Sequence, residues 1–89
     1  MISQNISIIN KLGLHARAAS KLVNCASQFE SEVFLVRNGN RVNAKSIMGV
    51  MMLAAGKGTT LELLIDGNDE SEAMAQIHAL ILERFGEEE

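Results

Sequence analysis

Residues 32–44 read EVFLVRNGNRVNA and carry the clearest structural signal in the chain. Asn38-Gly39 is the pair of residues that a tight hairpin turn prefers, because both positions can adopt a positive φ. On either side of this turn we predict two strands, Glu32–Arg37 and Arg41–Ala44. The sequence therefore predicts a β-hairpin in the middle of the chain.

The residues before the hairpin predict a strand and then an amphipathic helix. Within Ile2–Ile9, Ile6 and Ile8 alternate with polar residues, which is typical of a strand. Lys11–Leu14 interrupts the pattern, and a helix is predicted to begin at or just after His15. The apolar residues at helical spacing are Ala16, Ala19, Val23, Ala26 and Phe29, and those on the opposite face are Arg17, Lys21, Asn24 and Gln28.

The residues after the hairpin predict a short helix and a fourth strand. Ser46 is suited to cap a helix over Ile47–Leu53, a segment too rich in methionine for a good strand. Gly56-Lys57-Gly58-Thr59 lacks the full spacing of a phosphate-binding loop and precedes a strand, so we interpret it as a turn. The fourth strand is then Thr59–Ile65, which ends at Asp66-Gly67.

The last element is predicted to be a long helix that starts at Asn68 or Asp69. Its apolar stripe consists of Met74, Ile77, Ile81 and Phe85. His78 lies at the edge of this stripe, and we interpret it as a boundary residue rather than a ligand. The element order is βαββαβα, which predicts a single α+β domain over residues 1–89 with its helices packed on one face of a sheet.

Composition excludes several classes of function. Three Phe with no Tyr or Trp, in a chain of net charge −3, argue against a nucleic-acid-binding sheet, which needs aromatic residues and a basic surface. No Ser-His-Asp or Cys-His arrangement is evident, and two histidines without a cysteine cluster make a poor zinc site, so neither a metal nor a cofactor is expected. The single Cys25, with no signal peptide and no membrane-spanning segment, predicts a cytoplasmic protein without membrane insertion.

Charge is unevenly spread along the chain. Through Thr60 there are seven basic and two acidic residues, a balance of +5, and the remainder has one Arg and nine carboxylates, a balance of −8. The first part predicts a positive surface suited to an acidic partner or a phosphate. We interpret Glu87–Glu89 as a solvated tail.

His15 is the main candidate for chemistry. It lies where a loop containing Gly13 leads into a helix, so the free N–H groups of Ala16, Arg17 and Ala18 are expected to converge near its ring and to favour an anion. The helix dipole favours the neutral imidazole, which can accept a phosphoryl group, and Arg17 can offset charge in the transition state. Spacing alone leaves the alternative open that His15 only caps the helix and that Arg17 belongs to its polar face.

Ser46 and the residues after it form a second candidate site. Ser46 is suited to cap the helix, and a phosphate on it would add negative charge at that helix N-terminus. Ile47, Met48, Met51 and Met52 cover so much of the helix that some must face outward. Exposed methionine suits a surface that binds several partners, although a buried methionine cluster is the commoner arrangement.

Two separated segments carry a family resemblance. Gly13-Leu14-His15-Ala16-Arg17-Ala18-Ala19 resembles the active-site segment of HPr, the histidine phosphocarrier family of the bacterial phosphotransferase system. Asn43-Ala44-Lys45-Ser46-Ile47-Met48-Gly49-Val50-Met51 resembles the family's second signature, around a regulatory serine. The Lys57-Gly58-Thr59 turn and the element order also agree, so the resemblance covers the whole chain.

The resemblance implies an open-faced β-sandwich with a four-stranded antiparallel sheet, and a carrier rather than an enzyme that turns over a small molecule. Enzyme I, charged by phosphoenolpyruvate, would phosphorylate Nδ1 of His15, with Arg17 and the backbone of Ala16–Ala18 around the phosphoryl group. An enzyme IIA-type acceptor of a sugar or nitrogen-related branch would then receive it. A serine kinase would act on Ser46, and the carrier is expected to be a monomer. The implied docking residues are Lys21, Ile47, Met48 and Met51.

The chain departs from the family at Ala18, where Pro is usual. Alanine restores an N–H and loosens the first turn, but we expect transfer to survive because His15 and Arg17 remain. The main alternative is a regulatory binding module that signals through Ser46 without phosphoryl transfer. The retained His15 favours the carrier. The sequence does not separate the sugar branch from a nitrogen-related branch or from a carrier that serves a dihydroxyacetone kinase.

Overall fold

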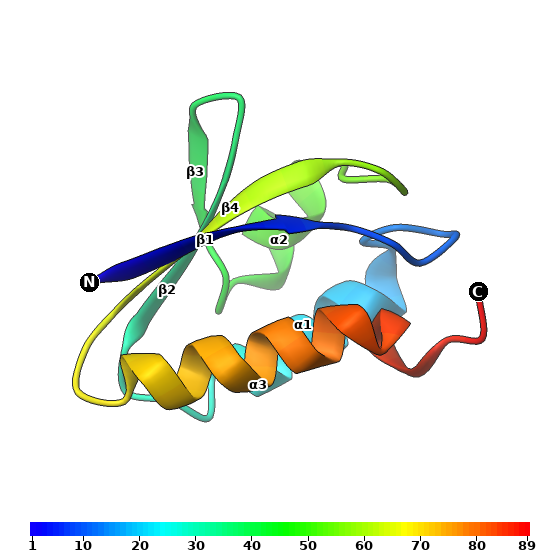
Figure 1. Cartoon of the computed structure of the whole chain (residues 1–89). Coiled ribbons are helices and arrows are strands. Elements are labelled where there is room, and N and C mark those ends of the chain that lie inside the picture. The colour runs from blue at the N-terminus through cyan, green and yellow to red at the C-terminus, as the bar shows by residue number, and fades with distance from the viewer.

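A computed structural model describes residues 1–89, and its elements follow the predicted order (Figure 1). These elements are β1 (Ile2–Ser7), α1 (Ala16–Ala26), β2 (Glu32–Arg37), β3 (Asn40–Asn43), α2 (Ile47–Met52), β4 (Thr60–Asp66), α3 (Glu70–Leu82) and a short 3-10 turn, η1 (Arg84–Gly86). The strands form one antiparallel sheet in the order β1-β4-β2-β3. The predicted α+β fold is therefore confirmed. None of the helices is long and apolar enough to cross a membrane.

One face of the sheet is covered by helices and the other is open. In the central strand β4, Leu61, Leu63 and Ile65 are buried, whereas the alternate side chains are partly exposed. Figure 1 shows α1 and α3 running side by side beneath the sheet, and α2 packs against α1 and β3. On the open face, the Arg41 guanidinium stacks over the Phe34 ring at 3.9 Å. Period-two alternation thus places a continuous core between the sheet and the helices.

The buried stripe of α1 differs from the predicted one. Ala16 is exposed, because it lies across the helix from Ala18, which is completely buried. Phe29 is buried, but it lies in the turn after the helix, which ends at Ala26. The buried residues of the helix itself are Ala18, Ala19, Leu22 and Ala26. The first turn therefore points its exposed side away from the core and towards the site described below.

The chain leaves α3 through a left-handed turn that the predicted stripe did not include. Ile77 and Ile81 are buried as predicted, but the helix ends at Leu82, before Phe85. Arg84 and Phe85 have backbone φ values of 56° and 55°, which residues other than glycine seldom adopt. This turn carries the Phe85 ring into the core, where it is completely buried. It also directs the last residues towards the start of α1 (Figure 1).

Asp69 links α3 to the turn that precedes β2. Its carboxylate makes no capping bond to its own helix. It accepts hydrogen bonds instead from the backbone N–H groups of Glu30 (2.9 Å) and Ser31 (3.0 Å) and from the Ser31 hydroxyl. These donors, the Ser31 hydroxyl first, hold the pKa of the Asp69 carboxyl below its ordinary value of 3.8. Ionised Asp69 therefore stabilises the folded state.

Asp69→Asn is expected to lower the thermal unfolding midpoint at neutral pH by several degrees, because an amide cannot accept all three of these bonds. A depressed pKa stabilises the fold above the unfolded-state value and ceases to do so as pH falls through the folded-state value. The gap between wild type and variant should thus be full above about pH 4 and narrow as the pH falls further. Calorimetry across pH measures the gap, and a gap that does not narrow between about pH 4 and pH 2 would contradict this assignment.

Candidate functional site

The loop before α1 is fixed by its own hydrogen bonds and by the turn after α2. Asn10 is completely buried, and its side-chain amide donates to the Gly13 carbonyl at 2.8 Å. Gly13 has φ +67°, and a Cβ there would lie 2.5 Å from the Ala55 carbonyl oxygen. The next residue, Leu14, donates its N–H to that same oxygen at 2.8 Å. Only glycine fits the left-handed conformation and the close approach at this position.

This loop presents His15 as the N-cap residue of α1. The backbone of His15 is extended, with φ −74° and ψ 177°, and its side chain makes no capping hydrogen bond. Its carbonyl accepts the first helical bond, from Ala19 N–H at 2.8 Å. The N–H groups of Ala16, Arg17 and Ala18 have no partner within the protein. Three donors and the positive end of the helix dipole therefore lie beside the imidazole.

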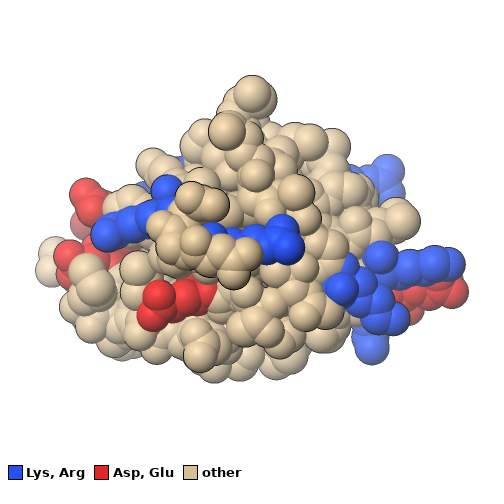
Figure 2. Space-filling view, turned by 90° about the horizontal axis from the view of Figure 1, so that it is seen from above, with Lys and Arg blue, Asp and Glu red and all other residues tan.

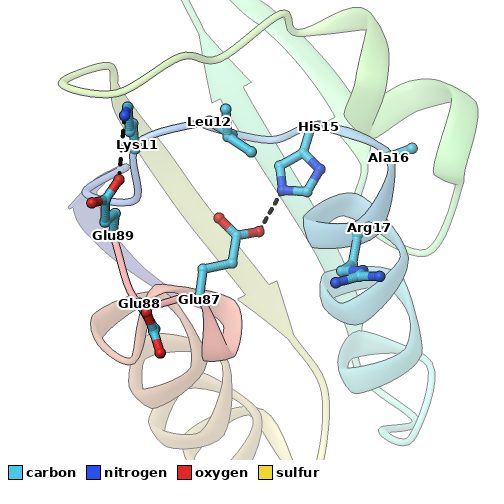
Figure 3. Close-up of a pocket in the computed structure, with 8 residues that line it drawn as sticks. All are labelled: Lys11, Leu12, His15, Ala16, Arg17, Glu87, Glu88 and Glu89. Carbon is cyan, nitrogen blue, oxygen red and sulfur yellow. Dashed lines mark hydrogen bonds and ion pairs between the residues drawn. The ribbon is translucent and has the colours of Figure 1, made fainter.

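The two ring nitrogens of His15 have different surroundings. Nε2 contacts a carboxylate oxygen of Glu87, whereas Nδ1 has no protein partner (Figure 3). Figure 3 shows Nδ1 on the side of Ala16 and Arg17. Arg17 is exposed and forms no ion pair, so its guanidinium is free to approach an anion at Nδ1. The side chain of His15 thus faces the site instead of capping the helix.

The prediction of a solvated tail over Glu87–Glu89 is wrong for Glu87, whereas the side chains of Glu88 and Glu89 are exposed. The Glu87 side chain is only 17% exposed and accepts from the Asn10 amide at 3.0 Å as well as contacting His15. These two partners, Asn10 first, lower the pKa of the Glu87 carboxyl from its ordinary value of 4.5. The segment returns to the site because Phe85 is buried in the core.

Two lysines hold the C-terminal segment in place on either side of Glu87. Lys21 Nζ donates to the Phe85 carbonyl at 2.6 Å, so this predicted docking residue is tied to the protein's own chain. The Lys11 N–H donates to the Glu89 carbonyl at 2.7 Å, and the Lys11 ammonium lies 3.3 Å from the Glu89 carboxylate. The C-terminal residues therefore form one wall of the site.

An open pocket of about 760 Å³ lies over the His15 ring. It is lined by Lys11, Leu12, His15, Ala16, Arg17, Glu87, Glu88 and Glu89. Leu12, which the sequence analysis did not select, is 66% exposed on its rim. No pattern in the sequence separates it from the other apolar residues of this loop, such as Leu14, which is buried. The pocket combines a free nucleophilic nitrogen, backbone donors, a cation and an apolar edge, which suits transfer of a phosphoryl group between proteins.

The second candidate site lies at α2. Ser46 is the N-cap, as predicted, and its Oγ accepts the Gly49 N–H at 3.2 Å. Of the predicted docking residues, Ile47, Met48 and Met51 are exposed, and they continue into the exposed Met52. Because α2 packs against α1, this apolar surface lies on the element next to the His15 helix. Viewed from above the sheet, Lys and Arg side chains form separate groups and no continuous basic track (Figure 2).

Comparisons with known proteins agree with this geometry. Residues 2–83 match the family model described as "PTS HPr component phosphorylation site". The chain is 61% identical to phosphocarrier protein HPr of Neisseria meningitidis over all 89 residues of both chains, and 60% identical to HPr of Cupriavidus necator over the same span. The crystal structure of HPr-C-His from Thermoanaerobacter tengcongensis superimposes with a TM-score of 0.97 at 44% identity, covering all of both chains.

Substitution of Gly13 tests whether close contact with Ala55 holds the loop in place. Gly13→Ala is expected to destabilise the protein by about 2 kcal/mol or more, because alanine is strained at positive φ and its Cβ approaches Ala55. Gly39→Ala is the matched control: Gly39 has φ +82°, but nothing lies within 4 Å of its Cβ position. Chemical denaturation should show the larger loss for Gly13→Ala. Equal losses would mean that contact with Ala55 does not hold this loop.

Proposed function

Because the chain belongs to the HPr family of phosphocarriers of the phosphotransferase system, we propose that His15 is the residue that carries the phosphoryl group. A protein of this family is a covalent intermediate in phosphoryl transfer and not an enzyme with its own turnover. The observation that carries the proposal is the unpartnered Nδ1 of His15 beside three unpaired N–H groups. No other side chain in the protein combines these features.

Nδ1 acts as the nucleophile and the first turn of α1 receives the anion. The phosphoryl oxygens accept hydrogen bonds from the N–H groups of Ala16, Arg17 and Ala18, which have no other partner. The Arg17 guanidinium offsets the charge on the transferring group. Ala18 supplies an N–H that proline would lack, so the substitution adds a donor at the cost of a less rigid turn.

The donor in this proposal is Enzyme I and the acceptor is an enzyme IIA-type protein. Leu12 on the pocket rim and the exposed residues of α2 provide apolar surface beside the nucleophile. Such a surface suits brief docking of successive partners, because methionine side chains adapt to different shapes. The carrier is proposed to act in the cytoplasm, as the family membership implies, and as a monomer, since the pocket is lined by residues of one chain.

Incubation with Enzyme I and phosphoenolpyruvate is expected to add one phosphoryl group, despite Ala18. Intact-protein mass spectrometry detects it, and acid treatment should remove it because phosphohistidine is acid-labile. His15→Ala should abolish the gain, whereas His78→Ala, the matched control in α3, should leave it unchanged. A gain that survives in His15→Ala would exclude His15 as the carrier residue.

Ser46 is proposed as a regulatory phosphorylation site in the same protein. Its hydroxyl is partly exposed and borders the apolar residues Ile47 and Met48. A phosphate there can accept the Gly49 N–H that Ser46 Oγ accepts now, so α2 is retained. The added negative charge would then weaken docking without unfolding the helix.

Ser46→Asp, as a mimic of this phosphorylation, is expected to slow phosphoryl uptake from Enzyme I by about tenfold or more, through a higher KM. Ser46→Ala is the control. It loses the capping bond and about 0.5–2 kcal/mol of stability but adds no charge, so it should accept the phosphoryl group at the wild-type rate. Equal rates for Ser46→Asp and Ser46→Ala would refute regulation at this position. If wild type takes up no phosphoryl group on His15, but a kinase phosphorylates Ser46, the chain is instead a regulatory binding module.

A further inference from the structure

We propose that Glu87 is a positioning residue for phosphoryl transfer: its carboxylate fixes the proton of His15 on Nε2 and so keeps the lone pair on Nδ1. The inference rests on the proposed role of Nδ1 as the nucleophile. A carboxylate only accepts hydrogen bonds, so an Nε2 that contacts Glu87 must carry hydrogen. In a neutral imidazole the other nitrogen, Nδ1, is then unprotonated.

The Glu87 carboxylate is itself held in one orientation. Asn10 Nδ2 donates to Glu87 Oε1 at 3.0 Å and to the Gly13 carbonyl at 2.8 Å. Both partners are acceptors, so a flipped amide would place its own oxygen against them. The Asn10 side chain keeps this orientation even though its Oδ1 is buried without a partner. The buried Asn10 therefore aims one carboxylate oxygen of Glu87 at the His15 ring.

The backbone on both sides of Glu87 is anchored as well. The completely buried Phe85 and the Lys21 bond to its carbonyl fix the chain before Glu87. The Lys11 N–H bond to the Glu89 carbonyl fixes the chain after it. Ordering of the carboxylate is thus completed on folding, before a partner arrives.

The Glu87 carboxylate also stabilises the His15 ring while the phosphoryl group is transferred. As the Nδ1 lone pair forms a bond to phosphorus, the bond from phosphorus to the donor breaks and its electron pair leaves with the donor. The proton stays on Nε2, so the ring gains positive charge. Glu87 lies at Nε2, where its carboxylate offsets this charge, and Arg17 lies towards Nδ1, where the phosphoryl charge arrives (Figure 3).

Glu87→Gln tests this role most directly. Glutamine has one accepting oxygen, whereas two groups, the Asn10 amide and His15 Nε2–H, donate to Glu87. Asn10 cannot turn, so the new amide oxygen pairs with Asn10 and the new NH₂ group faces the ring. That NH₂ donates to an unprotonated Nε2 and shifts the proton to Nδ1, which removes the nucleophilic lone pair. Glu83→Gln is the matched control, since it makes the same charge change on an exposed side chain that does not line the pocket.

Nitrogen-15 NMR of the His15 ring at about pH 8.5, where histidine rings are largely neutral, reads the tautomer directly. Wild type and Glu83→Gln should carry hydrogen on Nε2, and Glu87→Gln should show a substantial population with hydrogen on Nδ1. Phosphoryl uptake from Enzyme I should fall about ten- to a hundredfold in Glu87→Gln, in the kcat of Enzyme I rather than in its KM for the carrier, and stay unchanged in Glu83→Gln.

A wild-type ring with hydrogen on Nδ1 would overturn the inference, as would a Glu87→Gln ring and rate indistinguishable from those of Glu83→Gln. Faster uptake by Glu87→Gln would also overturn it, because Glu87 would then obstruct the site. These failures are distinct from failure of the proposed function. If wild type is phosphorylated on His15 but Glu87→Gln behaves as wild type, only the role of Glu87 is lost. The tautomer is measured without any phosphoryl donor, so it decides the role of Glu87 separately.

Discussion

The docking of Gly13 against Ala55 is the constraint on which the site depends. A left-handed glycine lets the loop approach the Ala55 carbonyl, and the Leu14 N–H bond to that oxygen fixes the loop there. The helix must then begin immediately after, at Ala16, with His15 as its cap residue. The free N–H groups of the first turn follow from this geometry, because the loop before them is not helical and its carbonyls do not accept their hydrogen bonds. The anion site is therefore a consequence of how the loop packs, and needs no basic patch.

The two sides of the His15 ring are lined by residues from opposite ends of the sequence. The helix that begins after residue 15 supplies the donors and Arg17 on the Nδ1 side, and the segment after α3 supplies Glu87 on the Nε2 side. Phe85 connects them, since its burial requires the left-handed turn that brings the chain back over α1. Core packing in this small domain thus determines both the fold and the orientation of one carboxylate. The open face of the sheet takes no part in the site.

Features with a local physical cause could be predicted from the sequence. The hairpin follows from the turn preference of Asn38-Gly39, and the start of α2 follows from the capping bond of Ser46. The first turn of α1 was predicted beside His15 from the interruption at Lys11–Leu14 and the helical spacing that follows it. The buried stripe of that helix was partly wrong, because small residues such as Ala16 and Ala18 differ in burial without differing in hydrophobicity. Glu87 was missed because its partners Asn10 and His15 are more than 70 residues away, and no local pattern records such a contact.

Amide NMR of the protein before and after phosphorylation measures most directly whether the first turn of α1 receives the phosphoryl group. The N–H signals of Ala16, Arg17 and Ala18 should move to lower field together, as free donors gain acceptors. The amides at the start of α3 should stay in place. Unmoved signals at Ala16–Ala18, with changes centred on Glu87–Glu89, would place the phosphoryl group on Nε2 and contradict the account.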